Sequence, residues 1–135
     1  MISTPHTVQL RHDLPDGSWH IDWMLDLTRD GVSPLTTFRV AGRVDELDAG
    51  ASMSAERLDD HRRAYLSYEG PIAGDRGSVQ RLAVGTFDAV QNIGDRWAFL
   101  VRWWDEPVST PIGRAQQLLL APATDEAWTV RCAAR

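Results

Sequence analysis

The stretch that decides the expected fold is residues 10–27, which read LRHDLPDGSWHIDWMLDL. From Trp19 onward, apolar and polar residues alternate strictly, a pattern that predicts a strand with two unlike faces. The indole and aliphatic side chains occupy one face. The other face carries His20, Asp22, Met24 and Asp26.

A turn and a second histidine precede this strand. Pro15 and Gly17 in the sequence PDG favour a chain reversal, because proline fixes φ and glycine tolerates positive φ. The reversal brings His12, at the end of the preceding strand, beside His20 and Asp22. Two imidazoles and a carboxylate can hold a divalent metal with positions open for water or substrate. The same spacing also fits an ordinary amphipathic strand whose polar residues face solvent.

Composition predicts one folded domain over residues 1–135. The apolar fraction is 43% and six residues are tryptophan, enough for a packed core. No apolar run reaches the roughly 20 residues of a membrane helix, and no signal-peptide pattern is present, so we expect a cytoplasmic chain without membrane contact. The single cysteine, Cys132, suits a reducing compartment and is expected to be a buried structural thiol.

The charged residues of the chain are biased in type and in sign. All fourteen basic residues are arginine, and the net charge is −5. This acidity argues against an extended, non-specific grip on nucleic acid, which needs many phosphate contacts. It allows a local grip on one phosphate, for which the planar arginine fork is well suited.

Short runs of alternating residues between turn residues predict a mainly β chain, a small closed or partly closed β-barrel of about eight strands with one or two short helical turns. Residues 53–58 fit either a strand or a helical turn, and residues 106–113 are expected to form a loop. Gly85 is expected to bend or bulge the chain between strands at 78–84 and 86–91. The other expected strands are 8–12, 35–40, 97–104, 116–120 and 128–132.

A second informative stretch is residues 59–77, DDHRRAYLSYEGPIAGDRG. His61 and Tyr65 stand four apart, so a helical turn over residues 60–68 places both side chains on one face. The glycines and proline that follow predict a turn-rich loop. Alternatively, the segment is a polar cap on the barrel, in which the tyrosines only pack.

Four motifs occur in order along the chain: His12-Asp13, His20-Ile21-Asp22, Asp60-His61 with Tyr65, and Tyr68-Glu69-Gly70. Residues 10–87 thereby resemble the 3′-phosphoesterase domain of bacterial DNA ligase D, whose motifs are His-Asp, His-x-Asp-x-Arg, Asp-His-(x)₃-Tyr and a Glu-Gly loop. The chain is most similar to the small stand-alone relatives that lack polymerase and ligase modules.

The resemblance implies a β-barrel with a crevice that holds a divalent metal, typically manganese (Mn²⁺). It implies removal of a 3′-phosphate or a terminal ribonucleoside from DNA or RNA, with DNA-repair proteins as partners. The implied metal ligands are His12, His20 and Asp22. His61 and Tyr65 take the phosphate-contacting positions, where they stabilise developing negative charge, and Asp59 or Asp60 orients His61.

The chain departs from the family pattern at several positions. Met24 stands where the family has an arginine, and Gly42 lies near the position of a family lysine. Seven residues separate His12 from His20 where five are usual, and the insertion falls at the Pro15-Asp16-Gly17 turn. Methionine cannot donate a hydrogen bond to phosphate. The candidates to supply the missing positive charge are Arg39, Arg43 and Arg76.

Two classes of function follow from these features. The first is a metal-dependent phosphoesterase acting on nucleic-acid 3′ ends, with Asp60, His61 and Tyr65 as its catalytic residues. The second is a weakened relative that binds a nucleotide, another phosphorylated ligand or a protein partner. The sequence leaves the oligomeric state open.

Overall fold

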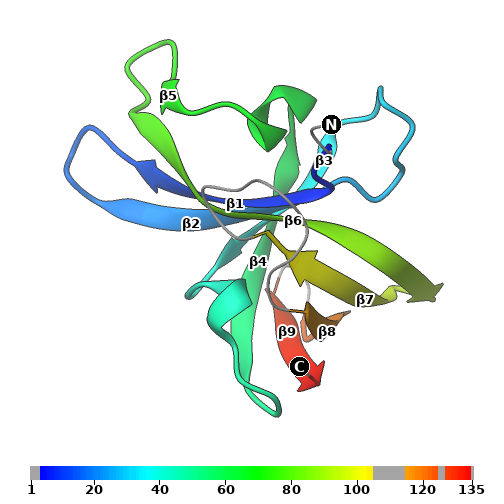
Figure 1. Cartoon of the computed structure of the whole chain (residues 1–135). Helices are drawn as coiled ribbons and strands as arrows, with labels where there is room; N and C mark the ends of the chain where they lie inside the picture. The colour runs from blue at the N-terminus through cyan, green and yellow to red at the C-terminus, as the bar shows by residue number, and fades with distance from the viewer. Residues whose placement is uncertain (1–3, 105–114, 125–126, 135) are drawn as a thin grey trace.

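The computed structural model describes residues 4–104, 115–124 and 127–134, and strands dominate these residues (Figure 1). The 3₁₀ turns in the described part are η1 (Val44–Glu46) and η2 (Arg63–Leu66). None of its helices is long and apolar enough to cross a membrane. The strands are β1 (Thr7–Asp13), β2 (Trp19–Leu25), β3 (Leu35–Val40), β4 (Ser52–His61), β5 (Gly70–Pro71), β6 (Ser78–Ile93), β7 (Arg96–Trp103), β8 (Ala115–Pro122) and β9 (Ala127–Ala134).

Eight strands of the described chain close into an antiparallel barrel. The order around the ring is β1-β2-β3-β4-β9-β8-β7-β6, and β1 pairs with β6 to complete it. Short β5 lies outside the ring and pairs with the start of β6. The predicted fold class, a small mainly β barrel with short helical turns, is therefore confirmed.

The long strand β6 replaces the two strands predicted on either side of Gly85. Its first half pairs with β1 and its second half with β7, and Gly85 is the residue where the partner changes. A Cβ at Gly85 would lie 2.7 Å from the Arg102 carbonyl oxygen, so glycine permits a close approach of two strands there. The register shift of β6 against β7 falls after Gly85, between Phe87 and Ala89.

Strand β4 settles the ambiguous region and corrects a prediction. Residues 53–58 are strand, and the strand continues to His61 because its end pairs with β3, where Leu35 lies opposite His61; β9 pairs only with the first half of β4. The helical turn predicted over residues 60–68 is confined to η2. The loop predicted at residues 106–113 lies outside the described residues.

Both faces of β2 are covered. Ile21, Trp23 and Leu25 join the main core inside the barrel. Met24 joins a second apolar cluster outside the barrel, which Leu66 of η2 helps to cover. In Figure 1 the green segment carrying η2 and β5 lies over this side of the β1–β2 hairpin. On the polar face of β2, Met24 is therefore covered by this segment and Asp22 is buried, whereas His20 stays partly exposed.

The turn η1 fills the barrel interior from the opposite side. Val44 packs in the core, and its main-chain N–H donates to Gln9 Oε1 at 2.8 Å. Gln9 Nε2 donates to Asp45 Oδ1 at 2.9 Å, and Gln116 Nε2 donates to the Val44 carbonyl at 3.1 Å. These bonds satisfy polar groups that would otherwise be costly to bury. Cys132 is buried in the same core, as predicted.

Candidate metal centre

The β1–β2 hairpin places the three predicted metal ligands together. His12 and His20 are directly opposite in the strand register, and Asp22 follows two residues later on the same face of β2. The additional residues of the turn are held locally, because Leu14 N–H donates to the Ser18 carbonyl at 2.8 Å. The seven residues between His12 and His20 are thus accommodated in the turn, and the two histidines stay directly opposite each other.

The ligand atoms of these side chains converge. His12 Nδ1 lies 3.2 Å from His20 Nε2, and His20 Nε2 lies 3.3 Å from Asp22 Oδ1. His12 Nδ1 lies 4.0 Å from Asp22 Oδ2. One ligand atom from each residue lies within 4.8 Å of the other two. Two neutral imidazoles and one carboxylate are a suitable donor set for a first-row divalent cation.

Asp22 supplies the observation that tests whether this set fits a cation. Its side chain is only 4% exposed, and Oδ1 has no hydrogen bond of good geometry within the described residues; its neighbour His20 Nε2, at 3.3 Å, is itself a candidate ligand atom. A buried carboxylate oxygen without a partner is costly, and a bound cation would remove that cost. The residues therefore fit a divalent metal.

Hydrogen bonding orients the His12 ring. Its Nε2 donates to the main-chain carbonyl of Arg76 at 2.8 Å, since a carbonyl oxygen can only accept. In the neutral ring Nδ1 then carries the lone pair, and Nδ1 is the atom that faces His20 and Asp22. The Arg76 carbonyl can reach His12 because the next residue, Gly77, lies against the main chain of Asp13. Gly77 has φ of +89°, and a Cβ there would overlap the carbonyl oxygen of Asp13.

Burial favours the neutral form of His20. Loss of solvent lowers the pKa of His20, the charge of Asp22 opposes this shift, and the charges of Arg39 and His12 reinforce it. Neutral imidazole is the form that binds metals. Arg39 Nη2 lies 3.4 Å from His20 Nε2 and so reaches the edge of the cluster.

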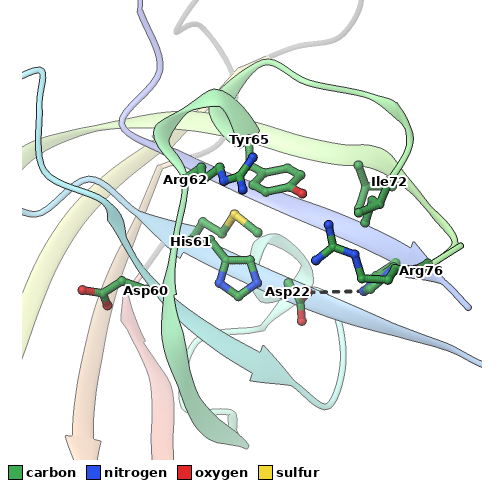
Figure 2. A pocket seen from close by; sticks show the side chains of 10 residues that line it. Asp22, Asp60, His61, Arg62, Tyr65, Ile72 and Arg76 are labelled. Carbon is green, nitrogen blue, oxygen red and sulfur yellow. Dashed lines mark hydrogen bonds and ion pairs between the residues drawn. The ribbon is translucent and has the colours of Figure 1, made fainter. Parts of the chain in front are cut away.

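A cavity of about 230 Å³ opens beside the cluster (Figure 2). In Figure 2 the His61 ring lies toward Asp22, and the Arg76 side chain extends into the space between Tyr65 and Asp22. The cavity therefore joins the predicted metal ligands to the predicted phosphate-contacting residues. Its polar lining includes His12, Asp22, His61, Arg62, Tyr65 and Arg76.

His61 and Tyr65 come from different elements. His61 is the last residue of β4, Tyr65 lies on η2, and their ring centroids are 6.0 Å apart. They meet through a strand end followed by a 3₁₀ turn, and not through the single helical turn predicted. His61 Nδ1 donates to the main-chain carbonyl of Asp59 at 2.8 Å, which leaves Nε2 as the other functional atom of the ring.

Asp60 lines the cavity, but its carboxylate is not the group bonded to His61. Its carboxylate points away from the cavity in Figure 2 and lies 3.3 Å from Arg57 Nη2 in an exposed ion pair. The group that orients His61 is thus the Asp59 main chain and not the Asp60 carboxylate.

The three candidate arginines are placed differently. Arg76 lines the cavity, and Arg39 lies outside it beside His20. Arg43 donates two hydrogen bonds to Asp45 and belongs to the η1 region. Arg62, which sequence reasoning missed, also lines the cavity. Its only sequence signal is its place directly after the Asp60-His61 motif.

Met24 and Gly42, the two positions where the ligase D pattern has basic residues, also lie in different surroundings. Met24 is 1% exposed and lines the floor of the cavity together with Ile72 and Val79. The position therefore faces the site but presents an apolar surface. Gly42 lies beside Met53, whose sulfur would be 4.0 Å from a Cβ at Gly42, and does not line the cavity.

Neither a family model nor a curated protein matches this chain. The resemblance to the ligase D 3′-phosphoesterase domain therefore rests on the four motifs and stays a hypothesis.

Proposed function

We propose that the chain is a divalent-metal-dependent phosphoesterase that removes a 3′-phosphate or a terminal ribonucleoside from DNA or RNA ends, with Mn²⁺ as its cofactor. The observation that carries this proposal is the shared cavity: His12 and Asp22 of the ligand cluster line it, His20 adjoins them, and His61, Tyr65 and two arginines lie around it. A single carboxylate among the ligands and two nearby guanidinium groups favour an anionic ligand over a cationic one.

Each residue has a role that follows from its position. His12, His20 and Asp22 hold the cation, which when bound polarises a phosphoryl oxygen and lowers the pKa of a water molecule. Arg62 and Arg76 attract and orient the phosphate. His61, held by the Asp59 carbonyl, presents Nε2 for a hydrogen bond to the reacting phosphate, and the Tyr65 hydroxyl can donate a second one.

Met24 limits the proposed reaction. It occupies the cavity floor where the family has an arginine, and a thioether cannot donate a hydrogen bond to phosphate. Loss of one preorganised donor to a developing charge costs about 10²-fold or more in rate. We therefore propose slow turnover.

The apolar floor also favours a second candidate function. A site with metal ligands but fewer hydrogen-bond donors can retain a nucleotide or another phosphorylated ligand without hydrolysing it.

Under either function we propose a cytoplasmic setting, in line with the single buried cysteine. Under the first function, DNA-repair proteins are the proposed partners.

The deciding experiment is a manganese-dependent assay on 3′-phosphorylated and 3′-ribonucleotide-ended oligonucleotides. We expect slow release of phosphate or nucleoside that stops with EDTA and with His61→Ala. Ile93→Ala is a control, because Ile93 is 75% exposed and does not line the cavity. If no divalent metal supports turnover while a 3′-nucleotide still binds, the binding function replaces the catalytic one.

A further inference from the structure

A second, larger groove meets the ligand cluster from the other side. It has a volume of about 600 Å³ and crosses β2, β3, β4 and the start of β9. His20 lines this groove, whereas His12 and Asp22 line the smaller cavity. The metal-ligand cluster therefore lies between the two, so a ligand that reaches the cluster can occupy both.

The lining of the groove combines apolar and polar parts. Ile21, Val40 and Ala55 are aligned across β2, β3 and β4 and are nearly buried, so they present little surface. Arg39 and Glu56 are aligned on neighbouring strands and are both exposed. One positive and one negative side chain leave the groove without a net charge.

Trp19 gives the groove an aromatic surface. It is 52% exposed although it is the first residue of β2, and it lines the groove. The Arg11 guanidinium lies 4.3 Å from the centre of its ring, and Arg11 is in turn held by Asp13 at 3.0 Å. A cation over one face fixes the indole plane while a large part of the ring stays accessible. Exposed indoles beside cationic groups bind nucleic-acid bases by stacking.

We infer that this groove binds the terminal nucleoside of the strand whose 3′-phosphate reaches the ligand cluster. The base stacks on Trp19, the Glu56 carboxylate accepts a hydrogen bond from a sugar hydroxyl or a base N–H, and Arg39 holds the phosphate side of the nucleoside. The volume lies within the range of pockets for small organic ligands, roughly 300–1,000 Å³. This inference rests on the proposed function, because it names the part of the substrate that the phosphate cavity leaves unbound.

The test measures binding without metal, so that it does not depend on turnover. Titration calorimetry compares a nucleoside 3′-monophosphate with inorganic phosphate on the metal-free protein. We expect the nucleotide to bind at least tenfold more tightly. Trp19→Ala should weaken nucleotide binding about tenfold, as expected for the loss of one stacked base, and should leave the affinity for phosphate unchanged. Trp19→Phe should keep most of the advantage.

Controls separate the groove from general effects of mutation. Ile93→Ala alters a 75% exposed side chain that lies outside the groove, and should change neither affinity. Because Trp19→Ala can affect folding, its far-ultraviolet circular dichroism and thermal midpoint are compared with those of Trp19→Phe. Equal affinity for nucleotide and phosphate, or a nucleotide advantage that Trp19→Ala leaves intact in a folded protein, overturns the inference. Equal binding of phosphotyrosine in place of the nucleotide overturns it in favour of a peptide ligand.

The outcomes also distinguish the groove from the proposed activity. Nucleotide binding that depends on Trp19, without hydrolysis by any divalent metal, keeps the nucleoside groove and rejects the phosphoesterase. Hydrolysis of 3′-phosphorylated oligonucleotides at the same kcat/KM in the native protein and Trp19→Ala keeps the phosphoesterase and rejects the groove.

Discussion

Arg63 and Asp26 are joined by two parallel hydrogen bonds, from Nη1 to Oδ1 at 2.9 Å and from Nη2 to Oδ2 at 2.7 Å. Arg63 lies on η2, and Asp26 follows the last residue of β2. Arg63 Nη1 also donates to the Ser33 carbonyl at 3.0 Å. This ion pair fixes η2, and with it Tyr65, over the strand that carries His20 and Asp22.

Removing Arg63 should therefore destabilise the fold and loosen the site. Arg63→Ala leaves the carboxylate of Asp26, which is 4% exposed, without its charged partner. We expect a loss of about 2–3 kcal/mol in the free energy of unfolding, somewhat less than for a fully buried pair because Arg63 is partly exposed. Urea denaturation measures it. Arg57→Ala breaks the exposed Arg57–Asp60 pair and should cost less than about 1 kcal/mol; equal losses would contradict the assigned role.

The same pair should make stability depend on pH at the acid end. Hydrogen bonds from Arg63 lower the pKa of Asp26 in the folded protein, against the opposing effect of burial. A lowered carboxyl pKa contributes stability that is present above the unfolded pKa, about 4, and is lost as pH falls toward the folded pKa. Asp26→Asn should therefore flatten the fall in unfolding free energy below about pH 4. Parallel curves for the two proteins would show that other carboxylates cause the loss.

The three ligand residues should bind one divalent metal. We expect Mn²⁺ to bind the native chain with a stoichiometry of one in titration calorimetry, and His20→Ala to abolish this binding. His61→Ala should bind Mn²⁺ as before but lose turnover, because His61 lies across the cavity from the cluster. Unchanged Mn²⁺ binding in His20→Ala would contradict the assignment.

Gly77 should be needed for the orientation of His12. Gly77→Ala introduces a Cβ that overlaps Asp13, so the loop must move and take the Arg76 carbonyl away from His12 Nε2. Loss of such an outer hydrogen bond typically weakens metal binding by about 10- to 100-fold. Gly74→Ala is a matched control, because Gly74 also has positive φ, +80°, but a Cβ there meets only Arg76 Nε at 3.6 Å. Calorimetry of both variants with Mn²⁺ separates loop displacement from backbone strain.

Met24 should set both stability and rate. Met24→Arg introduces at the cavity floor the donor of the ligase D pattern and should raise phosphate release, but it also places a charge in the apolar cluster with Leu66 and Val79. We expect a lower thermal midpoint, since burying a charge beside apolar groups is costly. Met24→Leu should change stability by less than about 1.5 kcal/mol and leave turnover slow. A folded Met24→Arg protein with unchanged turnover would argue against a phosphoryl site at this position.

The sequence predicted the site best where the structure is local. His12, His20 and Asp22 lie in one hairpin, so strand alternation and a recognisable turn were enough to bring them together. The end of β4 was mispredicted as helix because it is held by pairing with β3, and such distant pairing leaves no local pattern. The irregular segment containing η1 gave no signal of its burial, which depends on Gln9 and Gln116 from distant strands.

The partners of long side chains were harder to predict from the sequence than the strands were. Arg39, Arg43 and Arg76 are equally plausible in sequence, yet only Arg76 enters the cavity, because Arg43 binds Asp45 and Arg39 turns to His20. An arginine side chain is long, so its partner depends on which strands are neighbours. The pairing of β1 with β6, which closes the ring, likewise joins residues about 70 positions apart. The sequence predicted a barrel, but it did not predict which residues of these two strands lie opposite each other.

Strand β1 has hydrogen-bonded neighbours along both edges, β2 and β6. The main chain that carries His12 is therefore held before any ligand arrives, and little conformational entropy remains to be lost on binding. Its amide protons should be among the slowest to exchange with solvent in the metal-free protein. Metal binding beside β1 should consequently follow single-step kinetics. Its on-rate should be set by encounter and dehydration of the ion and not by folding of the hairpin.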